Sequence, residues 1–177
     1  RLQISREEIT APELQLPSET ADGVRINVMG NICMLSDFEL LKRFNNDGVG
    51  LYRTEFMYMM HESFPSEMEQ YRIFRSVAKM AAPNNVTIRA LDIGGDKPLK
   101  YFALHDEVDP MLGFRSLRIL LQHREIFETH VRAMLRASQR GNIKLLFPMV
   151  AHYEDIIAIK EVIAEIMSDL ENWYGKK

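Results

Sequence analysis

Strand-like and helix-like segments alternate along most of this 177-residue chain. Short apolar segments with the pattern of strands lie at residues 24–29, 49–53, 86–91 and 143–150. Segments with helical periodicity lie between and after them. Parallel strands need long crossover connections, which helices usually provide. The alternation therefore predicts an α/β fold whose parallel sheet is buried on both faces.

Two of the predicted helices begin with a capping-box pattern, in which a serine is followed three residues later by a glutamate. The pattern occurs at Ser36 and Glu39, and again at Ser66 and Glu69. Apolar residues at helical spacing follow both pairs. We therefore expect a helix after the first strand and a second helix before the strand at residues 86–91.

Composition and charge restrict the class of protein. Apolar residues make up 46% of the chain and charged residues 27%, which is typical of a globular domain. The net charge of −3 offers no basic surface for nucleic acid or an anionic membrane. One cysteine, Cys33, cannot form an internal disulfide, and the first ten residues are not an apolar targeting segment. We expect a cytoplasmic protein that binds neither nucleic acid nor membrane.

Three arginines occur at positions where a buried strand or its end would not tolerate an isolated charge. They are Arg53 in GLYRTEF, Arg89 in VTIRALD and Arg115 in MLGFRSLR. A guanidinium stays protonated, so it needs a carboxylate, a phosphate or an open cleft. The carboxyl ends of parallel strands form the usual ligand face, and forked donors suit a compact dianion. These residues predict a binding site for a small phosphorylated acid.

A purely structural role is the alternative for these arginines. In that interpretation Arg53 pairs with Glu55, or Arg89 with Asp92, and each pair serves to neutralise the rim of the sheet. One anion shared by all three arginines accounts for their positions together, which favours the binding site.

Residues 92–97 read DIGGDK, a glycine turn flanked by carboxylates. This turn could form a backbone nest near an anion or bring acidic groups near a metal. It could equally be a strand-to-helix turn that needs positive φ. The five histidines and Cys33 show no metal-ligand spacing. We therefore assign no catalytic and no metal-binding residue in this chain.

Four motifs carry a resemblance to a known family: GVGLYRTEFMYM, TIRALDIGGDKPLKYF, DPMLGFRSLRI and IKLLFPMV. From about residue 24 to about residue 166, the chain resembles the barrel domain of phosphoenolpyruvate-protein phosphotransferase. This enzyme is enzyme I of the bacterial sugar phosphotransferase system. The stretch FPSEMEQ is similar to the nitrogen-related branch of enzyme I, so either branch is open.

The resemblance implies an eight-stranded β/α barrel that binds phosphoenolpyruvate (PEP) and Mg²⁺. It also implies transfer of the phosphoryl group to a histidine on a separate domain, and from there to a carrier protein. By motif, Arg53 and Arg89 correspond to the arginines that hold the phosphate of PEP. Arg115 corresponds to a third arginine that lines the same pocket.

The extent of the pattern suggests part of such a barrel. A complete barrel has about 250 residues, and the pattern here accounts for about four βα units. We expect residues 1–23 to be a linker or lead-in and residues 24–177 to be the N-terminal half of the barrel. The Mg²⁺ ligands and the acceptor histidine are expected outside this chain, so it should be inactive alone. Unpaired strand edges favour a homodimer.

Two other classes of protein stay open. PEP synthase and pyruvate phosphate dikinase have related barrels with similar arginines. A non-catalytic anion-sensing module could keep the arginines without the chemistry. The succession of RTEF and DIGGDK favours enzyme I.

Overall fold

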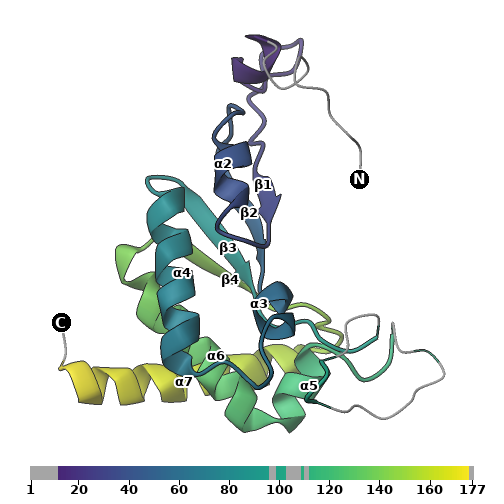
Figure 1. The fold of residues 1–177 in the computed structure, drawn as a ribbon, viewed down its shortest axis with the longest axis vertical. Coiled ribbons are helices and arrows are strands. Elements are labelled where there is room, and N and C mark those ends of the chain that lie inside the picture. Colours follow the sequence, from purple (N-terminus) through teal and green to yellow (C-terminus); the bar gives the residue numbers. More distant parts are fainter. Residues whose placement is uncertain (1–11, 96–98, 103–108, 110–111, 176–177) are drawn as a thin grey trace.

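A four-stranded parallel sheet lies at the centre of the fold (Figure 1). The structure is a computed structural model that describes residues 12–95, 99–102, 109 and 112–175. The sheet order is β1-β2-β3-β4, and all neighbouring strands are parallel. In chain order the strands span Gly30–Ile32, Gly48–Arg53, Asn85–Arg89 and Ile143–Leu146. The predicted α/β fold is confirmed, and its strand order is that of part of a β/α barrel.

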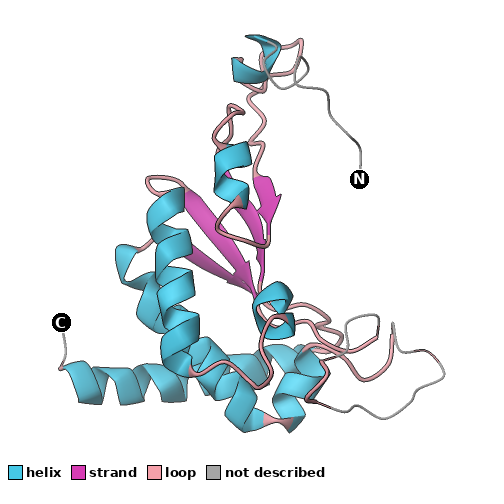
Figure 2. Ribbon diagram, viewed as in Figure 1, coloured by secondary structure: helices cyan, strands magenta, loops and turns pink. Residues whose placement is uncertain are grey.

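The described residues form three long helices, which Figure 2 shows beside and below the sheet. They are α4 (Glu67–Ala81), α6 (Arg124–Ala137) and α7 (Tyr153–Tyr174), and α6 packs against both others. The shorter helices are α2 (Asp37–Leu41), α3 (Glu55–Met59), α5 (Leu117–Gln122) and the 3₁₀ turns η1 (Pro12–Gln15) and η2 (Ser138–Arg140). Within the described ranges, no helix has the length and apolar character needed to cross a bilayer.

The hydrophobic core lies between the sheet and helices α4 and α6. One buried side of each helix faces the strands, as the apolar periodicity predicts. Fully buried members of this core are Phe74, Val77, Ala78, Val86, Ile88, Phe127, Val131 and Met134. Burial of a valine, isoleucine, phenylalanine or methionine side chain contributes roughly 1.5–3 kcal/mol. The core therefore anchors β3 and the residues that follow it.

Helix α4 begins with the predicted capping box. Ser66 Oγ accepts a hydrogen bond from Glu69 N at 3.3 Å, and Glu69 Oε2 accepts one from Ser66 N at 2.8 Å. Two backbone N–H groups at the helix start are thereby satisfied. This prediction is confirmed.

The capping box predicted at Ser36 is wrong. Ser36 has helical dihedral angles, φ −61° and ψ −25°, and its side chain makes no capping bond. The adjacent Asp37 instead binds the preceding turn, since its Oδ2 accepts from Cys33 N and Met34 N, both at 2.9 Å. A carboxylate therefore orders the turn between β1 and α2.

The strand predicted at residues 24–29 is also wrong. β1 begins at Gly30, just after this segment, and pairs with β2 from Val49. Val24, Ile26 and Val28 are exposed, at 46–53% of their reference surface. The alternation in this segment is real, but among the described residues its pairing is limited to an isolated antiparallel bridge between Arg25 and Glu19.

The third and fourth strands are shorter than predicted. β3 ends at Arg89 rather than at residue 91, and β4 ends at Leu146 rather than at residue 150. β2 ends at Arg53, beside Arg89, so the ladder between β2 and β3 stops there. Pro148 has no N–H to continue a ladder.

Candidate functional site

The carboxyl ends of β2 and β3 bring two of the predicted arginines side by side. Arg53 and Arg89 are the last residues of their strands, and they are register partners in the parallel ladder. Just beyond, Thr54 Oγ1 donates a hydrogen bond to Arg89 O at 3.0 Å. This bond connects the ends of β2 and β3 next to the two arginines.

Arg53 is exposed and lies next to the turn after β1. Its charge and a side-chain hydrogen bond act on the Cys33 thiol, and its charge also acts on Asp37. Burial and the charge of Asp37 raise the pKa of Cys33, and Arg53 opposes them. Burial also disfavours ionised Asp37, but the N–H groups of Cys33 and Met34, the thiol and Arg53 together lower its pKa. Arg53 therefore has an ionised carboxylate close by.

Arg89 points into a more enclosed environment, with 17% of its side-chain surface exposed. Its Nη2 forms an ion pair with Glu55 Oε1, and its Nη1 lies 3.4 Å from Asp92 Oδ2. The Nε of Arg89 is buried, and within the described part of the chain it has no hydrogen-bond partner. Two carboxylates therefore hold this guanidinium through its two Nη atoms, and its Nε is enclosed by the protein.

Arg115 is buried and contacts Asp92 through a forked arrangement. Its Nη2 donates to Asp92 Oδ1 at 3.0 Å and to Oδ2 at 3.1 Å, and its Nε donates to Oδ1 at 3.2 Å. Asp92 is thus shared by Arg89 and Arg115. This carboxylate links the end of β3 to the segment that leads into α5.

The glycine turn after β3 allows this contact. Gly94 has φ +103°, and a Cβ at this position would lie 2.8 Å from Arg115 Cβ and 3.0 Å from Phe114 O. The Ser116 N–H also donates to Ile93 O at 2.9 Å. These features support the interpretation of DIGG as a turn that needs positive φ. Asp96 and Lys97, which complete the motif, lie outside the described residues.

The structure therefore connects the three arginines as two neighbouring pairs. Arg53 and Arg89 are neighbours through the strand register, and Arg89 and Arg115 are neighbours through Asp92. Pairing with nearby acids, the structural alternative for these residues, occurs for Arg89 and Arg115. Asp92 and Glu55 fix the orientation of the guanidinium groups of Arg89 and Arg115.

A divalent cation does not fit the described part of this site. Glu55 and Asp92, the acids at the strand ends, already contact guanidinium groups. Within the described ranges, no group of three or more His, Cys, Asp or Glu residues could hold a metal ion. The described residues therefore contribute cationic groups rather than metal ligands.

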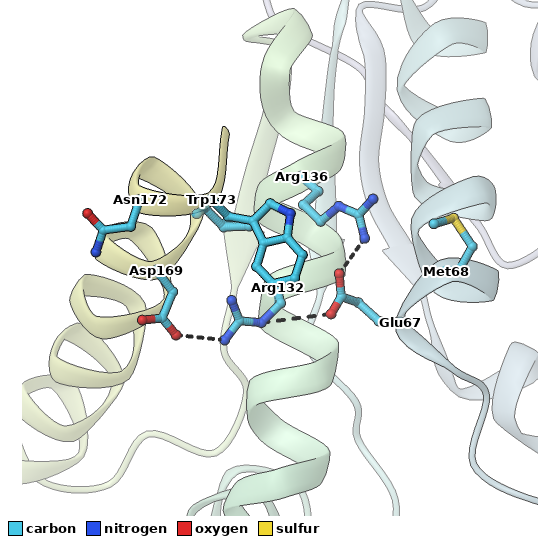
Figure 3. A pocket seen from close by; sticks show the side chains of 8 residues that line it. Glu67, Met68, Arg132, Arg136, Asp169, Asn172 and Trp173 are labelled. Carbon is cyan, nitrogen blue, oxygen red and sulfur yellow. Dashed lines mark hydrogen bonds and ion pairs between the residues drawn. The ribbon is translucent and has the colours of Figure 1, made fainter. Parts of the chain in front are cut away.

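A surface pocket of about 740 Å³ lies elsewhere, between α4, α6 and α7 (Figure 3). Its charged lining residues pair with one another: Arg136 with Glu67, and Arg132 with Asp169 at 3.0 Å. Figure 3 shows these groups projecting from the three helices rather than from the strand ends. This pocket is separate from the arginines singled out in the sequence.

Comparison with protein families identifies the domain. A family model described as "PEP-utilising enzyme, PEP-binding domain" matches residues 7–177, which is nearly the whole chain.

Curated relatives are about 40% identical over most of this chain. Phosphoenolpyruvate-protein phosphotransferase of Mycoplasma genitalium is 39% identical over 151 residues, covering 85% of this chain and 26% of the relative. The protein of the same name from Haemophilus influenzae is 40% identical over 168 residues, covering 94% of this chain and 29% of the relative. Multiphosphoryl transfer protein 2 of Escherichia coli is 40% identical and is covered over 19% of its length. The chain thus spans about a quarter of these relatives, and it belongs to the family of PEP-binding domains of PEP-utilising enzymes.

Proposed function

We propose that this chain provides the phosphate-binding side of a PEP-protein phosphotransferase of the enzyme I type. In the whole enzyme, the phosphoryl group of PEP passes to a histidine on a separate domain and then to a carrier protein. The family match and the names of the relatives support this reaction. Within the proposal, residues 24–177 form the barrel part, residues 1–23 lead into it, and the enzyme acts in the cytoplasm.

The observation that carries the proposal is the pairing of Arg53 with Arg89 at the carboxyl ends of adjacent parallel strands. In parallel β/α folds this edge is where ligands bind. Arg115 joins the pair through Asp92. Three guanidinium groups in this order can donate several hydrogen bonds to one phosphate.

These residues would act by binding and charge stabilisation. Phosphoryl transfer depends on holding the phosphate in line and on neutralising the charge on its oxygens. Arg53 is exposed and can meet an incoming phosphate, whereas Glu55 and Asp92 hold Arg89 and Arg115 in place. Because a guanidinium stays charged, the arginines need no proton transfer to do this. The proposal assigns the Mg²⁺ ligands and the acceptor histidine to other segments of the enzyme.

Calorimetric titration of PEP into the protein tests the proposal. We expect PEP to bind, and pyruvate, which lacks the phosphate, to bind at least about tenfold more weakly, because the phosphate supplies the charge-assisted hydrogen bonds. Equal affinity for both ligands, or no PEP binding, would refute the site.

The Mg²⁺ ligands and the acceptor histidine belong, in this proposal, to other segments of the enzyme. We therefore expect negligible pyruvate release from PEP when Mg²⁺ and an isolated histidine domain are added to this protein. Rapid release would overturn that assignment while leaving the binding site intact.

We also propose that the protein forms a homodimer through its sheet edges. In the described part of the chain, β1 and β4 each pair with one strand, and exposed apolar residues precede β1. Unpaired edges beside apolar surface favour association. Light scattering during size-exclusion chromatography should give a molar mass of twice the chain mass. The Ile26→Lys substitution should shift the measured mass toward that of one chain. A monomer at all concentrations would contradict this proposal.

A further inference from the structure

A buried hydrogen-bond network that reaches the segment after β3 centres on His130 in α6. The imidazole is fully buried, with the rings of Tyr58 and Phe74 edge-on at centroid distances of 5.7 and 5.6 Å. His130 Nδ1 lies 2.7 Å from Gln70 Oε1 and 2.9 Å from Tyr58 Oη. His130 Nε2 lies 3.1 Å from the backbone N of Leu91. A ring in this apolar setting thus has polar partners for both nitrogens.

These contacts determine the protonation state of His130. A backbone N–H can only donate, so Nε2 must be the unprotonated acceptor of the Leu91 bond. The proton of the neutral ring is therefore on Nδ1, which donates to Gln70 Oε1. Tyr58 Oη also donates to Gln70 Oε1 at 2.9 Å. Burial lowers the pKa of His130 to about 3, which agrees with a neutral ring.

The network contacts the chain between Arg89 and Asp92, the carboxylate that holds Arg115. Leu91 lies between Arg89, which ends β3, and Asp92, which holds Arg115. The Ala90 N–H still donates to Leu146 O at 2.8 Å, and the next N–H along the chain, that of Leu91, donates to His130. His130 thus supplies an acceptor beyond the end of the strand, where a buried N–H would otherwise cost free energy.

Helix α3 provides a second connection between His130 and the arginines. Tyr58 contacts His130 and Gln70, and Glu55 on the same short helix forms the ion pair with Arg89. Tyr101 Oη donates to the carbonyl of Tyr58 at 2.9 Å, which further fixes this helix. In Figure 1, α3 lies next to the carboxyl ends of the strands, between the sheet and α5. His130 is thus bonded to the segments that carry Asp92 and Glu55.

We propose that His130 is a positioning residue for Arg89 and Arg115. As a neutral acceptor for the Leu91 N–H and a partner of Tyr58, it holds the acids that orient Arg89 and Arg115. The consequence for PEP binding rests on the proposed function, whereas the positioning itself rests on the hydrogen bonds.

Two amide substitutions distinguish the roles of the two ring nitrogens of His130. In His130→Gln the amide oxygen reaches the place of Nε2 and can still accept from Leu91. In His130→Asn the shorter amide reaches the place of Nδ1 and keeps the donor toward Gln70, but it loses the acceptor for Leu91. Both variants place one amide in the same buried site, so their volumes and polarity are similar. Urea unfolding of each protein measures how much general stability they lose.

We expect amide hydrogen exchange at Leu91 to be about tenfold faster in His130→Asn than in wild type, because one buried hydrogen bond is lost. The PEP dissociation constant should rise by about the same factor. His130→Gln should restore both quantities to within about threefold of wild type, a rescue that follows from its acceptor. If both variants lose PEP affinity equally, or if Leu91 exchange is unchanged in His130→Asn, the positioning role is wrong.

Nitrogen NMR of the wild-type protein keeps the test independent of variant folding and of PEP. We expect His130 Nε2 to be unprotonated and Nδ1 to carry the proton from about pH 5 to pH 8. A proton on Nε2 would overturn the inference directly. If wild type binds no PEP but Leu91 exchange responds as expected, the proposed function fails and the positioning role stands.

Discussion

Replacing Arg53 by alanine is expected to weaken PEP binding by about 2–3 kcal/mol, or roughly 30- to 150-fold in Kd. The reason is the loss of charge-assisted hydrogen bonds to the phosphate at the mouth of the site. Because Arg53 is exposed at the end of β2, the protein itself should lose little stability. Calorimetric titration with PEP, combined with urea unfolding, measures the two effects separately.

Arg89→Lys provides a second variant at the same edge of the sheet. Lysine keeps the positive charge toward Glu55, so the buried carboxylate retains a cation, but the planar fork is lost. We expect weaker PEP binding with modest loss of stability. Arg124→Ala is the matched control, since this exposed arginine at the start of α6 pairs with Glu128 and Glu165. PEP affinity that is unchanged in Arg53→Ala and Arg89→Lys would refute the arginine assignment.

Asp92→Ala should have the largest effect on stability. It removes the carboxylate that Arg115 contacts through two nitrogens and that Arg89 also approaches, at a position where Asp92 is buried. Breaking a buried ion pair by removing one partner costs about 3–5 kcal/mol. The midpoint of urea unfolding should fall accordingly, with little change in slope.

The controls for Asp92→Ala separate charge from shape. Asp92→Asn keeps the side-chain volume and a carbonyl acceptor, so its loss of stability should be smaller than that of Asp92→Ala. Glu128→Ala removes a partner of Arg124 on the surface of α6, and such pairs contribute about 0–1 kcal/mol. An Asp92→Ala protein that unfolds at the same urea concentration as Glu128→Ala would show that Asp92 has no structural role.

The arginine pair was predictable because it depends on local pattern and on one rule of topology. Residues 49–53 and 86–91 read as strands from their apolar and β-branched side chains. Parallel strands end at the same edge of a sheet, so arginines at both ends become neighbours. The strand register, which makes Arg53 and Arg89 partners, agrees with this expectation.

The missed features have physical causes in the surroundings of each residue. Helix α3 was missed because its N-cap residue Thr54 has no glutamate three residues later, and the Thr54 hydroxyl donates to Arg89 O instead of capping the helix. The alternation at residues 24–29 matches a strand, yet no strand pairs with it in the described part of the chain. His130 carried no signal of this role in the sequence, because its partners Leu91, Tyr58 and Gln70 are far away along the chain.

The amino-acid sequence by itself determined the α/β class, the capping box of α4, and the placement of Arg53 at the end of one strand and of Arg89 near the end of the next. These depend on periodicity, on neighbouring residues and on the common direction of parallel strands. The tertiary structure alone decided that Asp92 joins Arg89 to Arg115 and that His130 accepts from Leu91. Such contacts depend on how α3, α5 and α6 pack around the end of β3, because packing brings together groups that local sequence keeps apart.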